Sequence, residues 1–306
     1  MIQSREYGGE ADYQRVRELL MESYAITGRL HNWGIDCWDW FRYNGRVFEE
    51  IANARSWERE VRLWETDGGQ LVGVVIPDEG DVSLQIHPHY RHIEEEMLGW
   101  AERHHQAGRP DGAGEWSLSL YVYEYDQERQ PLLEGRAYQN LGHDSFMRRR
   151  SLDQPIPDFG LPPGYVVQNL AGKGREALEK RAAAANDAFG ITKHTAETIQ
   201  TLQKAPTYRP ELDLVVVGLD GTFVAYCVIW FDEANGIGMF GPVGTRPAYG
   251  RRGLGKALMC AGLRRLEGLS ASMAYVDCDL DVAANRLYAS VGFTDYDRVF
   301  HWQKEF

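Results

Sequence analysis

Three glycines and three basic residues lie close together in the stretch RPAYGRRGLGKAL (246–258): Gly250, Gly253, Gly255, Arg251, Arg252 and Lys256. Leu254, Leu258 and Leu266 recur at roughly helical spacing, so we expect a helix to begin inside this cluster. The start of a helix carries unpaired N–H groups and the positive end of the helix dipole. Glycines let an anion approach these N–H groups closely, and the basic side chains add charge. The stretch therefore predicts a phosphate-binding loop.

An ordinary surface turn before an amphipathic helix is the alternative interpretation of this stretch. Its spacing matches neither GxxxxGK[ST] nor a GxGxxG motif that follows a first strand and precedes an acidic residue by about twenty positions. Basic residues at a helix start oppose the helix dipole, however, and therefore need a reason to be there.

The elements that position this loop follow from the pattern of the C-terminal half. We expect a strand over 165–170, a helix over 174–189, and a second helix within 191–204 that begins at Thr192 or Thr195. Antiparallel strands follow through Val243, and a further strand covers 272–280 after the glycine-opened helix. Asp281 is expected to cap a last helix. This pattern predicts a mixed sheet flanked by helices.

Two pairs of segments indicate an internal repeat. RAYQNLGHD (136–144) and RLYASVGFTD (286–295) share an Arg-x-Tyr-x-x-apolar-Gly pattern at a separation of 150 residues, and HPHY (87–90) matches RPAY (246–249) at 159. Each copy also has two apolar runs joined by an Asp-Gly turn. We therefore predict two related α/β (α+β) domains, 1–150 and 164–306, joined by a Pro- and Gly-rich linker at 151–163.

Composition limits the functional classes. The chain has 306 residues and a net charge of −12, which argues against a nucleic-acid partner, and the Arg148–Arg150 run is interpreted as a solvated charge run. The sequence shows neither an apolar run of membrane-spanning length nor a signal-peptide pattern, so we expect a cytoplasmic protein without a membrane partner. Four scattered cysteines without zinc spacing predict reduced thiols and no metal. Monomer and homodimer both remain open.

Two motifs in the C-terminal half resemble the GNAT superfamily of acyl-CoA-dependent N-acyltransferases. The GNAT signature [QR]xxGx[GA] corresponds to residues 250–255, and an NxxAxxLYxxxGF-like segment corresponds to DVAANRLYASVGF (281–293). The resemblance covers roughly 165–306, and the tandem layout resembles two-domain members of the superfamily. Two positions depart from the motifs: Gly250 replaces Gln or Arg, and Asp281 replaces Asn.

The resemblance implies a set of site residues and acetyl-CoA as the acetyl donor. Main-chain N–H groups from Arg252 to Ala257 would bind the pyrophosphate, with charge from Arg251, Arg252 and Lys256. The pantetheine arm would run along Val243–Thr245, and the Val243 N–H would polarise the thioester carbonyl. Tyr288 would give a proton to the departing thiolate, unless it is an ordinary packed tyrosine. The cofactor-binding residues implied in full are Val243, Gly244, Thr245, Arg251, Arg252, Gly253, Leu254, Gly255, Lys256, Ala257, Asp281 and Asn285.

The general base has several candidates. Resembling sequences often carry a glutamate where this chain has Gly241. The candidates that remain are Asp277 and Asp279 on one face of a strand, Glu233, His194 and the C-terminal carboxylate of Phe306.

The N-terminal copy is predicted to be catalytically degenerate. At the 159-residue separation, Glu94 replaces Gly253 and Glu96 replaces Gly255, which would repel a pyrophosphate and block close approach. His87, His89 and His92 are interpreted as a histidine-rich turn instead of a metal site.

An aromatic stretch, HNWGIDCWDWFRY (31–43), lies in the N-terminal copy. Its large rings either line an acceptor pocket or belong to the core or a domain interface, and core or interface is preferred: Trp33, Trp38, Trp40, Phe41 and Tyr43.

These observations predict an N-acetyltransferase that transfers acetyl from acetyl-CoA directly to a small amine in a ternary complex. A non-catalytic acyl-CoA-binding sensor or regulatory protein is the alternative, favoured by the absence of a glutamate at Gly241.

Overall fold

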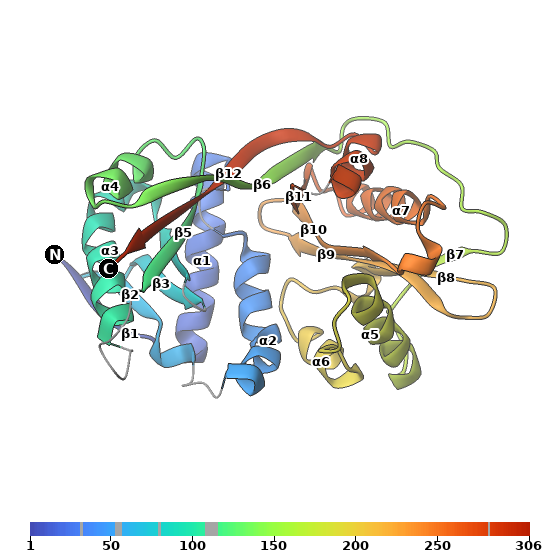
Figure 1. Cartoon of the computed structure of the whole chain (residues 1–306), viewed down its shortest axis with the longest axis horizontal. Helices are drawn as coiled ribbons and strands as arrows, with labels where there is room; N and C mark the ends of the chain where they lie inside the picture. Colours follow the sequence, from blue (N-terminus) through green and yellow to red (C-terminus); the bar gives the residue numbers. More distant parts are fainter. Residues whose placement is uncertain (31–32, 53–56, 79–80, 108–115, 281) are drawn as a thin grey trace. The chain divides into compact units, whose positions relative to one another are not determined.

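The chain forms two units, each built on a mixed sheet with helices on both faces (Figure 1). The computed structural model describes residues 1–30, 33–52, 57–78, 81–107, 116–280 and 282–306. Unit 1 comprises Met1–Ile35, Asn53–Ser145 and Asp297–Phe306, and unit 2 comprises Asp36–Ala52 and Phe146–Tyr296. Residues 36–52 thus belong with the C-terminal half, and residues 297–306 belong with the N-terminal half. The predicted fold class, mostly antiparallel mixed sheets flanked by helices, is confirmed.

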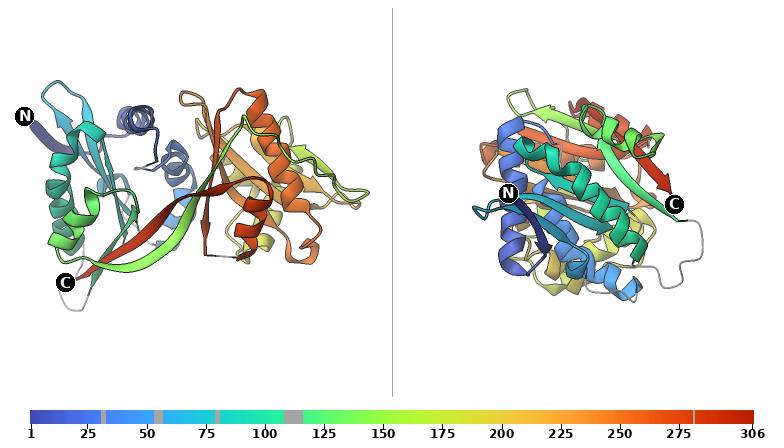
Figure 2. Two further views of the ribbon diagram at one scale, coloured as in Figure 1. Left: turned by 90° about the horizontal axis from the view of Figure 1, so that it is seen from above. Right: turned by 90° about the vertical axis from the view of Figure 1, so that its left-hand side faces the viewer.

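Unit 1 has the strand order β1-β2-β3-β4-β5-β12, in which only the β4–β5 pair is parallel. Helix α1 covers one face of this sheet, and α3 and α4 cover the other (Figure 2). The elements are β1 (Ile2–Glu6), α1 (Glu10–Thr27), β2 (Arg62–Thr66), β3 (Leu71–Asp78), β4 (Asp81–Ile86), η2 (Pro88–Ile93), α3 (Glu94–Ala107), β5 (Ser117–Tyr123) and α4 (Arg129–Gly135), with β12 (Thr294–Glu305) and β6 (Gln139–Ser151) shared with unit 2.

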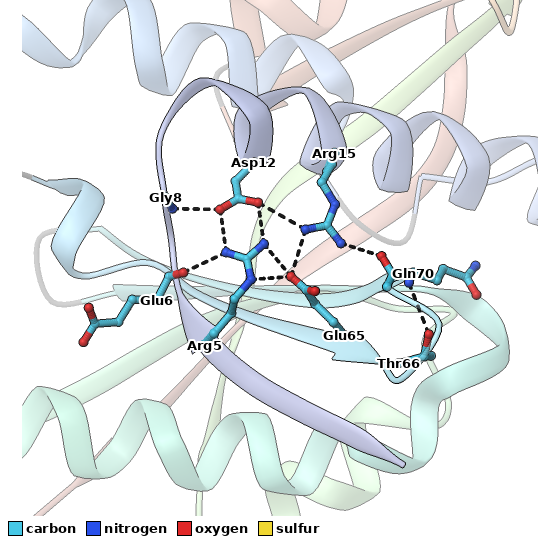
Figure 3. A network of polar contacts seen from close by, with 9 residues as sticks. Arg5, Glu6, Gly8, Asp12, Arg15, Glu65, Thr66 and Gln70 are labelled. Carbon is cyan, nitrogen blue, oxygen red and sulfur yellow. Dashed lines mark hydrogen bonds and ion pairs between the residues drawn. The ribbon is translucent and has the colours of Figure 1, made fainter.

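Polar contacts join the first elements of unit 1 (Figure 3). The Arg5 guanidinium on β1 donates to both oxygens of Asp12 on α1, at 2.6 and 2.5 Å, and also donates to Glu65 on β2. Arg15 bridges Glu65 at 2.8 Å and the carbonyl of Gly69 at 2.7 Å in the Asp-Gly turn between β2 and β3. The hydrogen bond from Arg5 lowers the pKa of Asp12. This network fixes α1 on the edge of the sheet.

Unit 2 has the strand order β7-β8-β9-β10-β11, with β10 and β11 parallel and the other pairs antiparallel. Helices α7 and α8 cover one face, and α5 and α6 cover the other (Figure 1). The elements are α2 (Ile35–Ala52), β7 (Val166–Asn169), α5 (Arg175–Phe189), α6 (Ala196–Leu202), β8 (Asp213–Val217), β9 (Phe223–Asp232), β10 (Ile237–Thr245), η4 (Pro247–Tyr249), α7 (Leu254–Gly268), β11 (Met273–Asp279) and α8 (Val282–Ser290).

Burial on both faces explains why β9 is apolar throughout. Cys227, Ile229 and Phe231 pack with the α7 side, whereas Tyr226 packs with α5. Such a strand lies in the centre of a sheet that helices cover on both faces. The start of α6 at Thr195 is also confirmed, because Thr195 forms a capping box there.

The internal repeat is present, but its last part aligns at 155 residues instead of 150. The Tyr138 N–H donates to the carbonyl of Leu133 at 3.0 Å, and the Phe293 N–H donates to that of Tyr288 at 3.1 Å. Tyr138 therefore corresponds to Phe293, and Leu133 corresponds to Tyr288. The sequence match misled because α4 ends before Tyr138, whereas α8 contains Tyr288. Unit 1 thus has an aliphatic side chain where unit 2 has a hydroxyl.

The interpretation of Arg148–Arg150 as a solvated charge run is wrong. Arg150 is 2% exposed, and its guanidinium donates to four backbone carbonyls: those of Ser151, Gln154, Pro155 and Val291. Arg148 pairs with Asp295 at 2.7 Å, and Arg149 lies 4.2 Å from the ring centroid of Tyr296. The buried guanidinium is stable because main-chain acceptors replace water around it.

Candidate active site

Strands β10 and β11 diverge at one end of unit 2. They pair only over Ile237–Phe240 with Met273–Val276. Beyond this point β10 continues as Val243–Thr245, which pairs with β9, after an irregularity that begins at Phe240. The edge of β10 that faces β11 therefore has no strand partner in this segment, as expected for a site that accepts an extended ligand as an additional strand.

The antiparallel register determines which backbone groups point into this gap. The Arg246 N–H donates to the carbonyl of Val224 at 3.0 Å, so this pair is hydrogen bonded. Hydrogen-bonded and non-hydrogen-bonded pairs alternate along an antiparallel ladder. Gly244 is therefore bonded to β9, whereas Val243 and Thr245 direct their N–H and C=O groups away from β9. The predicted donor, the Val243 N–H, faces the gap between the strands.

The glycine cluster forms the N-terminus of α7, as the sequence predicts. Gly253 is the N-cap residue with a φ of 77°, and Arg251 also has a positive φ of 59°. No side chain caps this helix start. The N–H groups of the first helical residues, Leu254, Gly255 and Lys256, lack intrahelical acceptors. The Ala257 N–H donates to the Gly253 carbonyl at 3.0 Å, so it already has an acceptor within the helix, unlike the three N–H groups before it.

Close packing at Gly255 places the helix start beside β10 and α8. A Cβ atom at Gly255 would lie 3.1 Å from Leu287 Cδ2 and 3.7 Å from Thr245 Oγ1. The diverging end of β10, the start of α7 and the helix that carries Tyr288 therefore meet at one point. Glycine keeps the N-terminal N–H groups accessible there.

Two of the three cations of the loop have neutral partners. Arg252 donates to the Tyr165 hydroxyl at 2.8 Å, and Lys256 Nζ lies 5.0 Å from the ring centroid of Phe159. Arg251 is exposed. Within the described part of the chain, no ion pair of Arg251, Arg252 or Lys256 with a carboxylate is found. Their charge is thus available to an anion at the start of α7.

Tyr288 is part of the core on the α7 side and is 6% exposed. Burial raises the pKa of its hydroxyl, and negative charge on Cys227 and Cys278 would raise it further. The Asp277 and Asp279 carboxylates add to the rise, so both act electrostatically on this hydroxyl. The hydroxyl is therefore protonated at neutral pH, as a proton donor must be.

The side chain of Asn285 contacts the protein itself. It donates to the carbonyl of Asp279 at 3.1 Å and accepts from Cys278 Sγ at 3.2 Å, which ties α8 to the end of β11. Asp281, the predicted cap of α8, lies outside the described residues.

The face of β11 opposite α7 carries two of the general-base candidates. Ala274, Val276 and Cys278 pack with α7, whereas Asp277 and Asp279 are exposed. Strand alternation therefore places both carboxylates on the opposite face, at the diverging end of the strand.

Gly241, where the resemblance leads one to expect a glutamate, has open space beside its α-carbon. A Cβ atom there would meet nothing within 4 Å. Its carbonyl accepts a hydrogen bond from the Trp230 indole at 2.6 Å. Sequence reasoning missed Trp230, although the alternation of Tyr226, Val228 and Trp230 along β9 could have placed it on this face.

The three other base candidates are Glu233, Phe306 and His194. Glu233 pairs with Arg209 at 2.7 Å in the β9–β10 hairpin, at the opposite end of β10 from Val243. Phe306 belongs to unit 1, where it binds the carbonyl of Trp116 at 2.9 Å. His194 lies between α5 and α6, and burial lowers its pKa.

The aromatic residues after position 31 divide between the two units. Trp38 is fully buried and stacks on Phe41 at 5.9 Å, and Trp40 and Tyr43 pack in unit 2 against the cluster that contains Trp230. Their interpretation as core holds for these contacts. Trp33 lies in unit 1, whereas His31 and Asn32 lie outside the described residues.

Asp36, at the start of α2 in unit 2, is a carboxyl group that sequence reasoning did not single out. Burial raises the pKa of Asp36 to about 7, and the nearby Asp39 carboxylate adds to the rise. Such a group exchanges protons near neutral pH.

The corresponding helix start in unit 1 is occupied by the protein's own carboxylates. Glu94 is 2% exposed, pairs with Arg91 at 2.8 Å and also binds Arg129. Asp126 binds Arg91 at 2.9 Å. The start of α3 thus carries ion-paired carboxylates of the protein itself, where the start of α7 has glycines.

The histidines of unit 1 form part of this turn. His87 is buried, and its ring accepts a hydrogen bond from the His89 N–H at 3.2 Å. Across the residues described, no group of three or more His, Cys, Asp or Glu side chains is arranged to hold a metal ion. None of the described helices is long and apolar enough to span a membrane.

In unit 2 the parallel strands β10 and β11 diverge beside the start of α7, and a protonated tyrosine lies on the next helix, α8. This arrangement is that of an N-acyltransferase of the acyl-CoA-dependent class. The model of the acetyltransferase (GNAT) family matches residues 174–293. The mycothiol acetyltransferase of Salinispora tropica is 30% identical over 78% of this chain and 79% of its own length. The chain belongs to the GNAT family of acetyltransferases and is similar to its tandem, mycothiol acetyltransferase-like members.

Two further comparisons extend this result. The mycothiol acetyltransferase of Paenarthrobacter aurescens is 29% identical over 74% of this chain and 72% of its own length. Other mycothiol acetyltransferases align over about half of their own length. A tandem GNAT protein from the clavulanic acid biosynthesis pathway superimposes with a TM-score of 0.69 at 17% identity, covering 100% of this chain and 98% of its own, which shows a shared fold.

Proposed function

We propose that this chain transfers acetyl from acetyl-CoA to a small amine by direct attack in a ternary complex, with unit 2 as the catalytic domain. The observation that carries the proposal is the contact of the glycine-opened start of α7 with the diverging end of β10, where Gly255 lies beside Thr245. GNAT acetyltransferases use acetyl-CoA, and these residues fit a ligand with an anionic and an extended part.

The donor site is assembled from backbone groups. The N–H groups of Leu254, Gly255 and Lys256 bind the pyrophosphate, and the cations of the loop neutralise it. Val243 and Thr245 offer strand-like hydrogen bonds to the pantetheine arm. Asn285 keeps α8 against β11 and thereby holds Tyr288 in place.

Acetyl-CoA, when bound, supplies an acetyl group activated as a thioester. The Val243 N–H donates to the carbonyl oxygen as the amine nitrogen attacks the carbonyl carbon. Tyr288 gives its proton to the sulfur as the C–S bond breaks. Asp277 or Asp279 accepts the proton lost by the amine, directly or through water. The products are an amide and free coenzyme A.

The acceptor is an amine of moderate size, and the relatives make a mycothiol-type amine the first to test. Exposed carboxylates on the acceptor face of β11 favour a cationic amine. Gly241, in place of a glutamate, leaves room for a substrate group there. Unit 1 is a degenerate copy, since Glu94 occupies its helix start and Leu133 replaces the tyrosine.

Thiol release from acetyl-CoA, measured with a panel of amines, tests this proposal. Turnover with at least one amine, and formation of the matching amide by mass spectrometry, is the expected result. Acetyl-CoA binding without turnover on any amine would support the alternative of a non-catalytic acyl-CoA sensor. If the protein does not bind acetyl-CoA, both the acetyltransferase and the sensor proposals are wrong.

A further inference from the structure

The segment 152–165, called the strap below, is built into unit 2 although its composition predicts a linker. It joins β6 to β7 and runs past α7 (Figure 1). Four of its side chains pack against the core cluster that includes Leu254 and Leu258 of α7: Ile156, Phe159, Leu161 and Tyr165. Flexible linkers make few such contacts with the domains they join.

Two arginines fix the course of the strap. Buried Arg150 donates to the carbonyls of Gln154 and Pro155 at 3.1 and 2.8 Å. Arg264 on α7 donates to the Pro157 carbonyl and to the Asp158 carboxylate, both at 3.3 Å. A buried guanidinium shared among main-chain carbonyls restricts the backbone that supplies them.

The middle of the strap covers the phosphate loop. A Cβ atom at Gly253 would lie 2.5 Å from Phe159 Cζ, so the ring packs directly on the N-cap residue of α7. Lys256 Nζ lies 5.0 Å from the same ring, and Arg252 donates to the Tyr165 hydroxyl at 2.8 Å. Two of the three cations of the loop are therefore held by aromatic residues of the strap.

Phe159 and Tyr165 are uncharged, so they do not neutralise the cations that they contact. Arg246, just before the loop, is paired with the Asp187 carboxylate at 2.6 Å, and its charge is compensated. An aromatic ring or a phenol orients a cation without cancelling its charge. Lys256 and Arg252 are thus held in place while their charge remains available to a phosphate.

We infer that the strap is part of the acetyl-CoA site, with Phe159 and Tyr165 as positioning residues for Lys256 and Arg252. The inference rests on the proposed function of unit 2. The two aromatic residues restrict the rotamers of two flexible cations before the ligand arrives, which reduces the entropy lost on binding.

Calorimetric titration of Phe159→Leu and Tyr165→Phe tests the inference, because these variants keep most of the packing. The ligands are acetyl-CoA and S-acetylpantetheine, which has the same thioester but no phosphate. We expect the Kd for acetyl-CoA to rise about 3- to 10-fold in each variant. The Kd for S-acetylpantetheine, measured by competition, should stay within about 2-fold of wild type, because no phosphate contact is lost. Leu269→Ala, at the exposed far end of α7, is the control and should change neither value.

Three outcomes separate the possibilities. If a variant loses affinity equally for both ligands, or only together with a fall in Tm, the strap has a merely structural role and the inference is overturned. If the wild type binds acetyl-CoA and both variants bind it with the same affinity, the inference about the strap is overturned and the proposed function still stands. A wild-type protein that does not bind acetyl-CoA would overturn the proposed function and this inference with it.

Discussion

At the scale of single residues, the site depends on two glycines whose lack of a side chain keeps the start of α7 accessible. Gly255 lacks a side chain where the start of α7 meets β10 and α8. Gly253 adopts a left-handed backbone beneath the Phe159 ring, a conformation and a space that other residues fit poorly. Unit 1 has Glu94 at the matching helix start, and its carboxylate is bound by Arg91 and Arg129. We therefore expect that a glycine or a glutamate at this helix start decides whether it binds an anion.

Gly255→Glu should abolish acetyl-CoA binding. The new carboxylate would lie at the helix start, where it would repel the pyrophosphate and block its close approach. We expect the Kd to rise at least about 100-fold, or nearly 3 kcal/mol, by calorimetry.

Gly268→Glu is the matched control for this substitution, because it adds the same side chain at the other end of α7, where a Cβ atom meets nothing within 4 Å. Its affinity should equal that of the wild type. Wild-type affinity in Gly255→Glu would show that the phosphate loop has been assigned to the wrong residues.

Tyr288→Phe should lower kcat by about 10²-fold and change the Kd for acetyl-CoA by less than about 2-fold, since only the proton donor is lost. Steady-state kinetics and calorimetry on the same preparation separate these effects. If kcat and the affinity for acetyl-CoA fall by the same factor, Tyr288 is a packing or binding residue instead of the proton donor.

The raised pKa of Tyr288 predicts the pH profile. A raised pKa keeps the hydroxyl protonated through neutral and mildly alkaline pH, so no loss of kcat from this group is expected up to about pH 9. If kcat of the wild type falls as the pH rises toward about 9, and this fall is absent in Tyr288→Phe, then Tyr288 is not a proton donor with a raised pKa.

At the scale of elements, positions are set by contacts between segments distant in sequence. The strap reaches the phosphate loop from 152–165, and the Arg5–Asp12–Glu65 network joins β1, α1 and β2 (Figure 3). Such contacts determine where a helix start lies relative to a strand edge. The sequence predicts that a helix begins near Gly253, but not that its N–H groups lie beside Thr245.

Asp12→Asn should lower the free energy of unfolding by about 1–2 kcal/mol at pH 7, because Arg5 loses a charged acceptor. The pKa of Asp12 is lowered in the folded state, so its contribution is complete above its ordinary pKa of about 4 and is lost as the pH falls through the folded value. The difference between variant and wild type should therefore shrink in acid.

Urea unfolding at several pH values checks this expectation. Asp67→Asn is the control, because the ion pair of Asp67 with the N-terminal ammonium is exposed and such pairs add little stability. Equal stability of Asp12→Asn and wild type at pH 7 would show that the network in unit 1 adds nothing to the fold.

At the scale of the whole molecule, a duplicated fold carries one predicted donor site. Both units retain the sheet and the helix after β4 or β10, because the apolar pattern that builds them is kept. Only unit 2 retains the open helix start and the tyrosine. Fold and site have thus diverged separately within one chain.

Calorimetric titration of the wild-type protein should therefore give one acetyl-CoA per chain. Glu94 excludes a second ligand by occupying the start of α3 with its own charge. A stoichiometry of two would contradict our interpretation of unit 1, and removal of exactly one of the two sites by Gly255→Glu would then assign the other to unit 1.

The sequence alone predicted the fold class and the helix that begins in the glycine cluster, and both are confirmed. The phosphate-binding role of the loop and the degenerate character of unit 1 stay predictions. These follow from local patterns: apolar periodicity, turn residues and the loss of glycine at Glu94. It also limited the start of the second helix to Thr192 or Thr195, and the structure has it at Thr195, where a capping box forms. It placed the last part of the repeat wrongly, because a Tyr match at 150 residues ignores where the helices end.

The tertiary structure decided what depends on long-range packing. Charge patterns made Arg148–Arg150 look solvated, yet the fold buries Arg150 among carbonyls. Composition predicted a linker at 151–163, yet the fold packs Phe159 of this segment on Gly253. The general-base candidates were separated only when β10 put Glu233 at its far end and β11 put Asp277 and Asp279 at the diverging one. Helix starts and turns are encoded by neighbours in sequence, whereas a site is made where distant segments bury surface against each other.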